Sequence, residues 1–208
     1  MHFIASKFTT TILIFFITSG VKNFDCNTVT QSHRFNIHER DYYDEIKLKI
    51  PDANSYCAAN DLNTDFYFLI NMQKHSGLNR FYIYNHKQDS VVHTGLVAHG
   101  SGDADFAATP IFSNVSGSKC TSLGHYKIGA AYTGNFGKAY KLHGLDSSNS
   151  NAFSRYVVLH SYHFMPNDET YPEYLLNSQG CPMLSEKFME IVSSYIDLSD
   201  KKVLLWIY

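Results

Sequence analysis

The sequence predicts a single domain that is mostly β, with one helix near its C-terminus. Aromatic residues are frequent, with 15 Tyr and 15 Phe among 208 residues, and such rings suit strands. From about residue 64 onward, short aromatic and β-branched runs alternate with turn residues, whereas one later segment has helical spacing. The hydrophobic content of 44% is typical of a globular chain that can form a real core.

The N-terminus has the pattern of an export signal. Lys7 precedes the apolar run FTTTILIFFITSG, which is too short to span a bilayer comfortably, and the small residues Thr18 and Gly20 offer a cleavage site. We therefore predict a signal peptide over residues 1–25, which places the mature protein in the periplasm or at the cell surface. A retained anchor or a buried first strand is the alternative.

Residues 26–62 form an N-terminal segment with a polar, irregular pattern. It contains one candidate short helix, in ERDYYDEIKLKI, which we expect to end at Pro51 because proline interrupts helices. The remaining residues, 63–208, are predicted to form the functional domain.

Strand-like runs dominate residues 63–208. They are DFYFLIN, RFYIYN, SVVHTGLVAH, HYKIGAAYT, AYKLHGL, RYVVLHS and the final KKVLLWIY. The long connection HGSGDADFAATPIFSNVSGSKCTS is rich in turn residues, and connections of that length are usually functional or disordered. The predicted helix starts after Ser185, a good N-cap, with Glu186 in its first turn.

Charge and cysteine spacing exclude some classes of protein. The net charge is −2 and no basic stripe is visible, so nucleic acid is not expected as a partner. The four cysteines show neither the spacing of a disulfide framework nor that of a zinc site; they are Cys26, Cys57, Cys120 and Cys181. At least one of them is therefore a candidate free thiol.

Cys181 is the first candidate for chemistry. It lies in NSQGCPML, four residues before the predicted N-cap, and the positive end of a helix stabilises a thiolate. Gly180 allows the N–H groups of Gln179, Gly180 and Cys181 to converge as an oxyanion hole, whereas Pro182 has no N–H to donate. A buried structural cysteine in a turn is the alternative.

A cysteine nucleophile needs a base, and RYVVLHSYHF supplies two candidates. His160 ends an apolar strand run, where a side chain can reach a site at the sheet edge. His163 follows in the loop. Either histidine can also be ordinary core or surface decoration.

Other polar residues are weaker candidates. His99 and His143, with the two histidines above, could suggest a metal-dependent hydrolase, but no pair has metal-ligand spacing with a nearby carboxylate, so we expect neither metal nor cofactor. Arg155, at the start of the strand that carries His160, could bind a substrate carboxylate. His99 and His163 are likewise candidates for substrate contact.

The order of several motifs resembles that of the murein L,D-transpeptidase catalytic-domain family (YkuD-like). Within this family the sequence looks most similar to the branch that carries Gly-Cys-Pro at the nucleophile. The motifs are SGLNRFYIYN, GLVAHGSG, FSNVSGSKCTSLGHYKIG, YKLHGLDSSNSNAFSRYVVLHS and SQGCP. The resemblance covers roughly residues 64 to 197. It implies a mostly β domain of sandwich or barrel type, with a helix after the nucleophile loop.

The resemblance also implies which residues act. Ser178, Gly180 and Cys181 match the family motif, and Gln179 stands where a histidine is usual. His160 corresponds to the family's catalytic histidine. Ser161 stands where glycine is common, and its backbone carbonyl would orient the imidazole.

The chemistry implied is acyl transfer on peptidoglycan stem peptides. Cys181 would attack the carbonyl of the L-centred diamino acid at position three, and D-alanine would leave. The thioester would pass to an amine of a neighbouring stem or to water, with His160 moving the proton. A carbapenem is an expected covalent inhibitor. The alternatives are an L,D-carboxypeptidase that trims tetrapeptides, or a non-catalytic wall-binding protein with the same fold.

Overall fold

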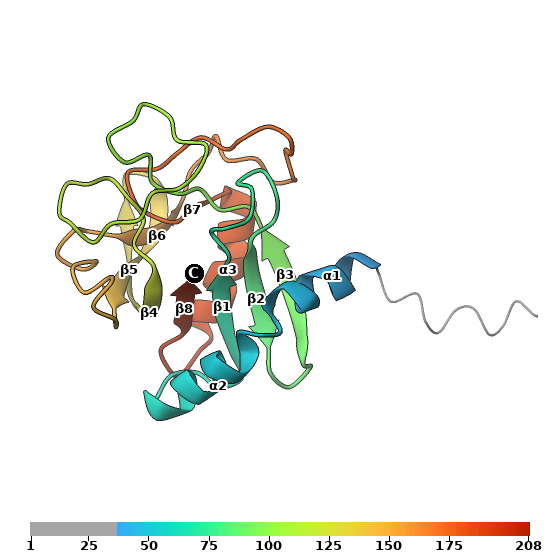
Figure 1. Cartoon of the computed structure of the whole chain (residues 1–208). Helices are drawn as coiled ribbons and strands as arrows, with labels where there is room; N and C mark the ends of the chain where they lie inside the picture. The colour runs from blue at the N-terminus through green and yellow to red at the C-terminus, as the bar shows by residue number, and fades with distance from the viewer. Residues whose placement is uncertain (1–36) are drawn as a thin grey trace, which may run out of the picture. The chain divides into compact units, whose positions relative to one another are not determined.

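The computed structural model describes residues 37–208, so the predicted signal peptide and Cys26 lie outside the described residues. The elements are α1 (Ile37–Ile46), α2 (Ile50–Ala59), β1 (Phe66–Ile70), β2 (Phe81–Asn85), β3 (Ser90–Gly95), β4 (Gly124–Gly134), β5 (Gly137–Gly144), β6 (Val158–Ser161), β7 (Met183–Leu184), α3 (Glu186–Asp197) and β8 (Leu204–Ile207). The predicted mostly β architecture is confirmed (Figure 1).

All eight strands belong to one sheet, in the order β3-β2-β1-β8-β4-β5-β6-β7. The last strand in sequence, β8, lies in the middle, parallel to β1 and antiparallel to β4. The short strand β7 adds to the edge, parallel to β6. This edge carries the residues that follow Cys181, because β7 begins at Met183.

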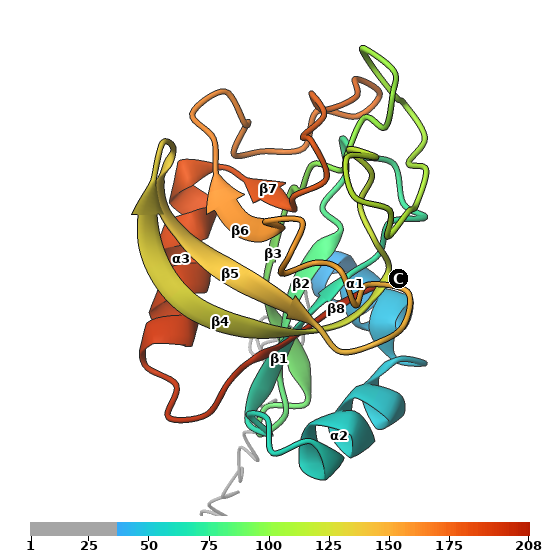
Figure 2. The same ribbon diagram turned by 90° about the vertical axis from the view of Figure 1, so that its left-hand side faces the viewer.

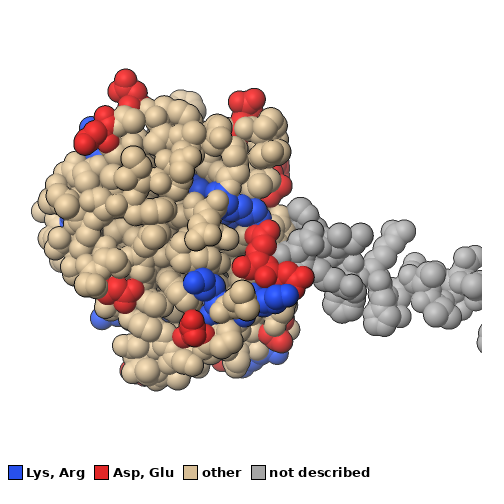
Figure 3. All heavy atoms as spheres, viewed as in Figure 1, with Lys and Arg blue, Asp and Glu red and all other residues tan. Residues whose placement is uncertain are grey.

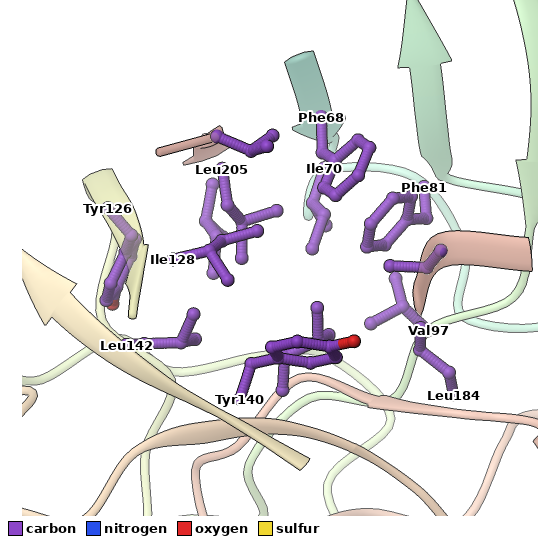
Figure 4. Close-up of a cluster of buried hydrophobic side chains, with 14 of the residues drawn as sticks. Phe68, Ile70, Phe81, Val97, Tyr126, Ile128, Tyr140, Leu142, Leu184 and Leu205 are labelled. Atoms are coloured by element: carbon purple, nitrogen blue, oxygen red, sulfur yellow. The ribbon is translucent and has the colours of Figure 1, made fainter. Parts of the chain in front are cut away.

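The central strands bury both of their faces. In β1, Phe68 and Ile70 point into the main core, while Tyr67 and Leu69 point to the opposite face of the sheet. The same alternation runs through β2 and β8, as expected for side chains with a period of two. Figure 4 shows the main core, where residues of β1, β2, β4, β5 and β8 meet Leu184 of β7.

The outer face of the sheet is covered by α1 and α2. Ile46, Ala53 and Cys57 are buried in a second core against the outer side chains of β1, β2 and β8. The predicted single helix ending at Pro51 is wrong: α1 ends at Ile46, and Pro51 stands in the first turn of α2. Proline suits that position because the first helical N–H groups have no partner within the helix.

The helix predicted after Ser185 is confirmed as α3. The Ser185 hydroxyl accepts the N–H of Phe188 at 3.2 Å, as an N-cap does. Phe188, Met189 and Val192 pack into the main core, so one face of α3 is buried.

Connections gather at one end of the domain. The segment 96–123 and the segment 162–182 lie beyond the ends of β6 and β7 in both ribbon views (Figures 1 and 2). Figure 2 also shows β4 and β5 as one long, curved hairpin. The curvature is consistent with a register irregularity between Ile128 and Ala131 of β4.

Two further properties concern the described residues as a whole. Among residues 37–208, no helix is long and apolar enough to cross a membrane. On the face seen in Figure 3, uncharged residues cover most of the surface, and the charged side chains form small groups in which both signs occur.

Candidate active site

A cavity of about 800 Å³ lies at the end of the domain where the connections gather. Its walls come from the tip of the β4–β5 hairpin, from Val158 and His160 of β6, and from the segment 176–183. The cavity therefore brings Cys181, His160, Ser178 and Gln179 together, as the sequence predicted for the nucleophile and its base.

A tight turn presents Cys181. The Ser178 hydroxyl donates to the Cys181 carbonyl at 2.6 Å and accepts the Gly180 N–H at 3.1 Å, which closes the turn on itself. Gly180 has φ of 111°, and a Cβ there would lie 2.9 Å from the Cys120 carbonyl oxygen. Glycine is required both for this backbone conformation and for the close approach. Ser178 thus holds the turn in shape.

The long connection 96–123 supports this turn through hydrogen bonds. The Thr121 hydroxyl accepts the Gly100 N–H at 3.0 Å and donates to the Gly180 carbonyl at 3.4 Å. The backbone of Ser178 is also bonded on both sides, because its N–H donates to His99 O at 2.9 Å and its carbonyl accepts from Ser101 N–H at 3.0 Å. The connection is therefore a support for the nucleophile.

The Cys181 thiol is a neutral group in this environment. The N–H of Val158 donates to its sulfur at 3.4 Å, and the sulfur lies 3.9 Å from the Tyr156 carbonyl. Burial raises the pKa of the Cys181 thiol above its ordinary value, although Val158 N–H and Arg155 act in the opposite direction. The expected thiolate at a helix terminus is corrected accordingly: β7 separates Cys181 from α3, and Ser185 caps that helix.

The imidazole of His160 has a defined tautomer. Its Nδ1 lies 2.8 Å from the Ser161 carbonyl, which can only accept, so Nδ1 carries the proton. The other nitrogen, Nε2, then has a free lone pair. Burial lowers the pKa of His160, so the ring remains neutral at neutral pH. A neutral base and a neutral thiol that line the same cavity suit proton transfer at the moment of attack.

The predicted oxyanion hole is modified by the turn. The N–H of Gly180 is already donated to Ser178, so it is not available to a developing oxyanion. The N–H groups of Gln179 and Cys181 have no hydrogen-bond partner within residues 37–208. Of the three N–H groups predicted to form the oxyanion hole, the two of Gln179 and Cys181 therefore remain as candidate donors.

Arg155 lies close to the nucleophile turn, and its guanidinium N–H groups are already hydrogen-bonded to other protein groups. Its guanidinium donates to the carbonyls of Ser113 at 2.9 Å and Cys120 at 2.7 Å, and to the Ser118 hydroxyl at 3.2 Å. It is not among the residues that line the cavity. Its contacts hold the connection that supports Gly180, and its positive charge acts to lower the pKa of Cys181.

His99 is buried away from the cavity. Its Nδ1 accepts from the Arg80 guanidinium at 2.9 Å, and its Nε2 donates to Ala107 O at 2.9 Å. The Asn177 side chain holds the backbone of Ala107 through two hydrogen bonds, 2.7 and 3.0 Å long. Since Asn177 precedes Ser178, this buried network positions the nucleophile turn, and both ring nitrogens of His99 are already used.

We expect the domain to lose stability as the pH falls from about 6.5 toward 4. Burial, together with the charge of Arg80, lowers the pKa of His99 to about 4. The unfolded chain binds a proton at His99 in that range and the folded chain does not, so acid favours unfolding, by up to about 3 kcal/mol. Urea denaturation at pH 7 and pH 4.5 measures this. His99→Gln should show a smaller loss between these two pH values than the exposed control His163→Gln, and equal losses would contradict the assignment.

The remaining predicted residues lie apart. His163 is exposed, its ring contacts Tyr162 and Phe164, and it does not line the cavity. His143 stacks on Phe153 outside the cavity. Within residues 37–208 no group of three His, Cys, Asp or Glu is placed to hold a metal ion.

Sequence reasoning missed several site residues. Phe136 at the hairpin tip and Tyr162 after β6 line the cavity, while Thr121 supports the turn. No local pattern marks Phe136, because its role depends on how far the hairpin reaches. Thr121 lies in the long connection, whose length was the one available signal.

Comparison with known proteins decides the family. Residues 40–208 match the family model of the L,D-transpeptidase catalytic domain. The chain belongs to this family. The family acts on peptidoglycan, so the cavity with Cys181 and His160 is the candidate active site of a family member. No curated protein sequence matches the chain.

Solved structures show a remote likeness. Pgp2, the helical cell shape determining protein from Campylobacter jejuni, is 16% identical over 76% of this chain and 54% of that chain, with a TM-score of 0.41. The L,D-transpeptidase from Mycobacterium smegmatis is 12% identical over 69% and 58%, with a TM-score of 0.41. The L,D-transpeptidase LdtMt1 in complex with imipenem is 13% identical over 69% and 59%, with a TM-score of 0.40. This chain thus spans less than two thirds of the length of these solved chains.

Proposed function

We propose that this protein is an exported cysteine acyltransferase of the L,D-transpeptidase type that acts on peptidoglycan stem peptides. One observation carries the proposal: Cys181 and His160 line the same cavity, with Nδ1 of His160 committed to Ser161 and Nε2 left as a base. Export remains part of the proposal, because the substrate lies outside the cytoplasmic membrane and residues 1–25 have a signal-peptide pattern.

The proposed reaction has two halves. The Cys181 sulfur attacks the carbonyl of the third stem residue while Nε2 of His160 takes the thiol proton. The C–N bond to D-alanine then breaks, and the imidazolium returns that proton to the leaving amine. In the second half an amine, or water, attacks the thioester, the C–S bond breaks, and His160 passes the proton of the incoming group to the sulfur.

The free thiols of the described residues favour this reading over a non-catalytic wall-binding protein. Cys57, Cys120 and Cys181 are all unpaired. Cys57 and Cys120 are buried outside the cavity, whereas Cys181 lies at its wall. Burial raises the pKa of Cys57 to about 12, so this thiol is inert at neutral pH.

Cys181→Ala is expected to abolish release of D-alanine from a disaccharide tetrapeptide. The sulfur is the proposed nucleophile, and no other described cysteine lines the cavity. Enzymatic assay of free D-alanine measures the reaction, and the matched control Cys120→Ser should keep most of the activity. Release that persists undiminished in Cys181→Ala would refute the proposal. Analysis of the products with and without an added acceptor amine separates transpeptidation from trimming.

We also propose that a carbapenem acylates Cys181 as a covalent inhibitor. A β-lactam carbonyl presents the same attack geometry as the stem-peptide carbonyl, and ring opening leaves an acyl-enzyme on the sulfur.

A further inference from the structure

The far half of the β4–β5 hairpin forms one wall of the cavity, and its strand β5 pairs with β6 there, with Ala139 opposite His160. Beyond the register irregularity, residues 130–133 of β4 are exposed. Tyr132 and Phe136 from this half line the cavity. Next to the tip, Lys138 and Tyr140 of β5 bind Asp197 at the end of α3, with Tyr140 Oη 2.6 Å from the carboxylate. The position of the cavity wall therefore depends on what holds the tip.

The tip rests on the catalytic base. The ring of Phe136 stacks on the imidazole of His160, with 5.5 Å between ring centroids and 25° between planes. Its edge meets the ring of Tyr162 at 5.3 Å and 87°. Phe136 is nevertheless 52% exposed, so its ring lies between His160 and solvent.

Ser161 connects the tip and the base through two different atoms. Its carbonyl accepts from Nδ1 of His160 at 2.8 Å, while its hydroxyl donates to the Phe136 carbonyl at 3.2 Å. Ser161 is buried, at 7% exposure, whereas Phe136 is half-exposed, so this hydrogen bond is partly buried. A residue without a hydroxyl at this position would keep the first contact and lose the second.

We propose that the Ser161 hydroxyl and the Phe136 ring are positioning elements that hold the hairpin tip over His160 and favour amine over water as the acceptor. This inference rests on the proposed function. Both residues act through His160 and the thioester environment: the hydroxyl fixes the tip, and the ring covers one face of the imidazole.

The consequence lies in the second half of the reaction. Both acceptors add to the same thioester carbonyl, lose one proton to His160 and expel the Cys181 sulfur, so the two reactions differ only in which nucleophile reaches the carbonyl. Water approaches from solvent at any opening, whereas an acceptor amine is delivered by a bound stem. An apolar ring between His160 and solvent therefore slows hydrolysis more than aminolysis.

Two variants test the two parts separately. Ser161→Ala removes the hydroxyl and leaves the carbonyl that binds His160, whereas Phe136→Leu removes the ring and leaves the backbone carbonyl that accepts from Ser161. For each variant we would measure the ratio of hydrolysed to crosslinked product at fixed acceptor concentration. We expect the ratio to rise about three- to tenfold, the size of one lost hydrogen bond or ring contact.

The chain offers a matched control for the ring. Phe153 is 50% exposed and stacks on His143 at 4.6 Å and 16°, but it lies outside the cavity. Phe153→Leu should keep the wild-type product ratio. An unchanged ratio in both Ser161→Ala and Phe136→Leu, in an enzyme that still forms acyl-enzyme, would overturn the inference and leave the proposed function intact.

A second measurement does not depend on activity. Amide hydrogen exchange at residues 134–138 should be at least about threefold faster in Ser161→Ala than in wild type, because the tip loses its hydrogen bond to β6. Unchanged exchange there overturns the inference that the Ser161 hydroxyl holds the hairpin tip, even if the protein proves to be inactive. If exchange rises but wild type forms no acyl-enzyme, the hydrogen bond between Ser161 and the hairpin tip stands as a structural contact, while the proposed function and the acceptor selection both fail.

Discussion

Replacing His160 with alanine is expected to slow acylation of Cys181 by about a hundredfold or more. The thiol has a raised pKa because it is buried, so little thiolate is present before the substrate binds. The reaction then needs a base, and Nε2 of His160 is the free imidazole nitrogen in the cavity. Stopped-flow or mass-spectrometric measurement of acyl-enzyme formation gives the rate constant.

The matched control is His143→Ala. This histidine also stacks on a phenylalanine, and its pKa is likewise lowered by burial, but it does not line the cavity. Its acylation rate should stay near that of wild type. The wild-type rate should also fall in acid only below pH 6.5, since His160 must be neutral to accept a proton and its pKa is lowered from 6.5. An acid limb centred above pH 6.5, or an equal rate in His160→Ala, would contradict the assigned base.

Arg80→Met is expected to lower the free energy of unfolding by about 3 kcal/mol or more. Arg80 is completely buried, and its guanidinium donates twice to Val97 O, once to Lys74 O and once to Nδ1 of His99. Methionine fills similar space but leaves these acceptors without a donor. Chemical denaturation of the purified domain measures the loss.

Arg155→Met is the control for this change. Arg155 also donates to backbone carbonyls, but it is only half-buried among the connections, where water can replace lost donors. We expect it to lose about 1 kcal/mol. Equal losses in the two variants would mean that the buried network around Arg80 has no special weight in holding the fold.

The strands could be predicted from the sequence because they are local signals, whereas the choice of His160 over His163 as the partner of Cys181 depended on the family resemblance. Short aromatic runs between turn residues mark strands, and the order of a strand-end histidine followed by a Ser-x-Gly-Cys segment is what resembles the family. Ser185 likewise marked the start of α3, since an N-cap bonds to the N–H of Phe188 only three residues away.

The parts that could not be predicted depend on contacts between distant segments. His99 contacts both Arg80 and Asn177, and these contacts form only after the sheet and the long connection have folded. The sequence therefore made His99 a candidate for substrate contact and did not predict its buried, structural position. The polar pattern of residues 26–62 predicted one short helix where the structure has α1 and α2. The few apolar side chains of these helices, such as Ile46 and Ala53, become buried only against the outer face of β1 and β8.

The most direct test is the intact mass of the mature protein after incubation with a carbapenem. Wild type should gain the mass of one carbapenem, and peptide mapping should place it on Cys181. The adduct should be absent in Cys181→Ala and should form slowly in His160→Ala, while Cys57 and Cys120 stay unmodified. A wild-type protein that gains no mass, or that carries the adduct on one of the two buried cysteines, would contradict the account that this cavity holds an activated nucleophile.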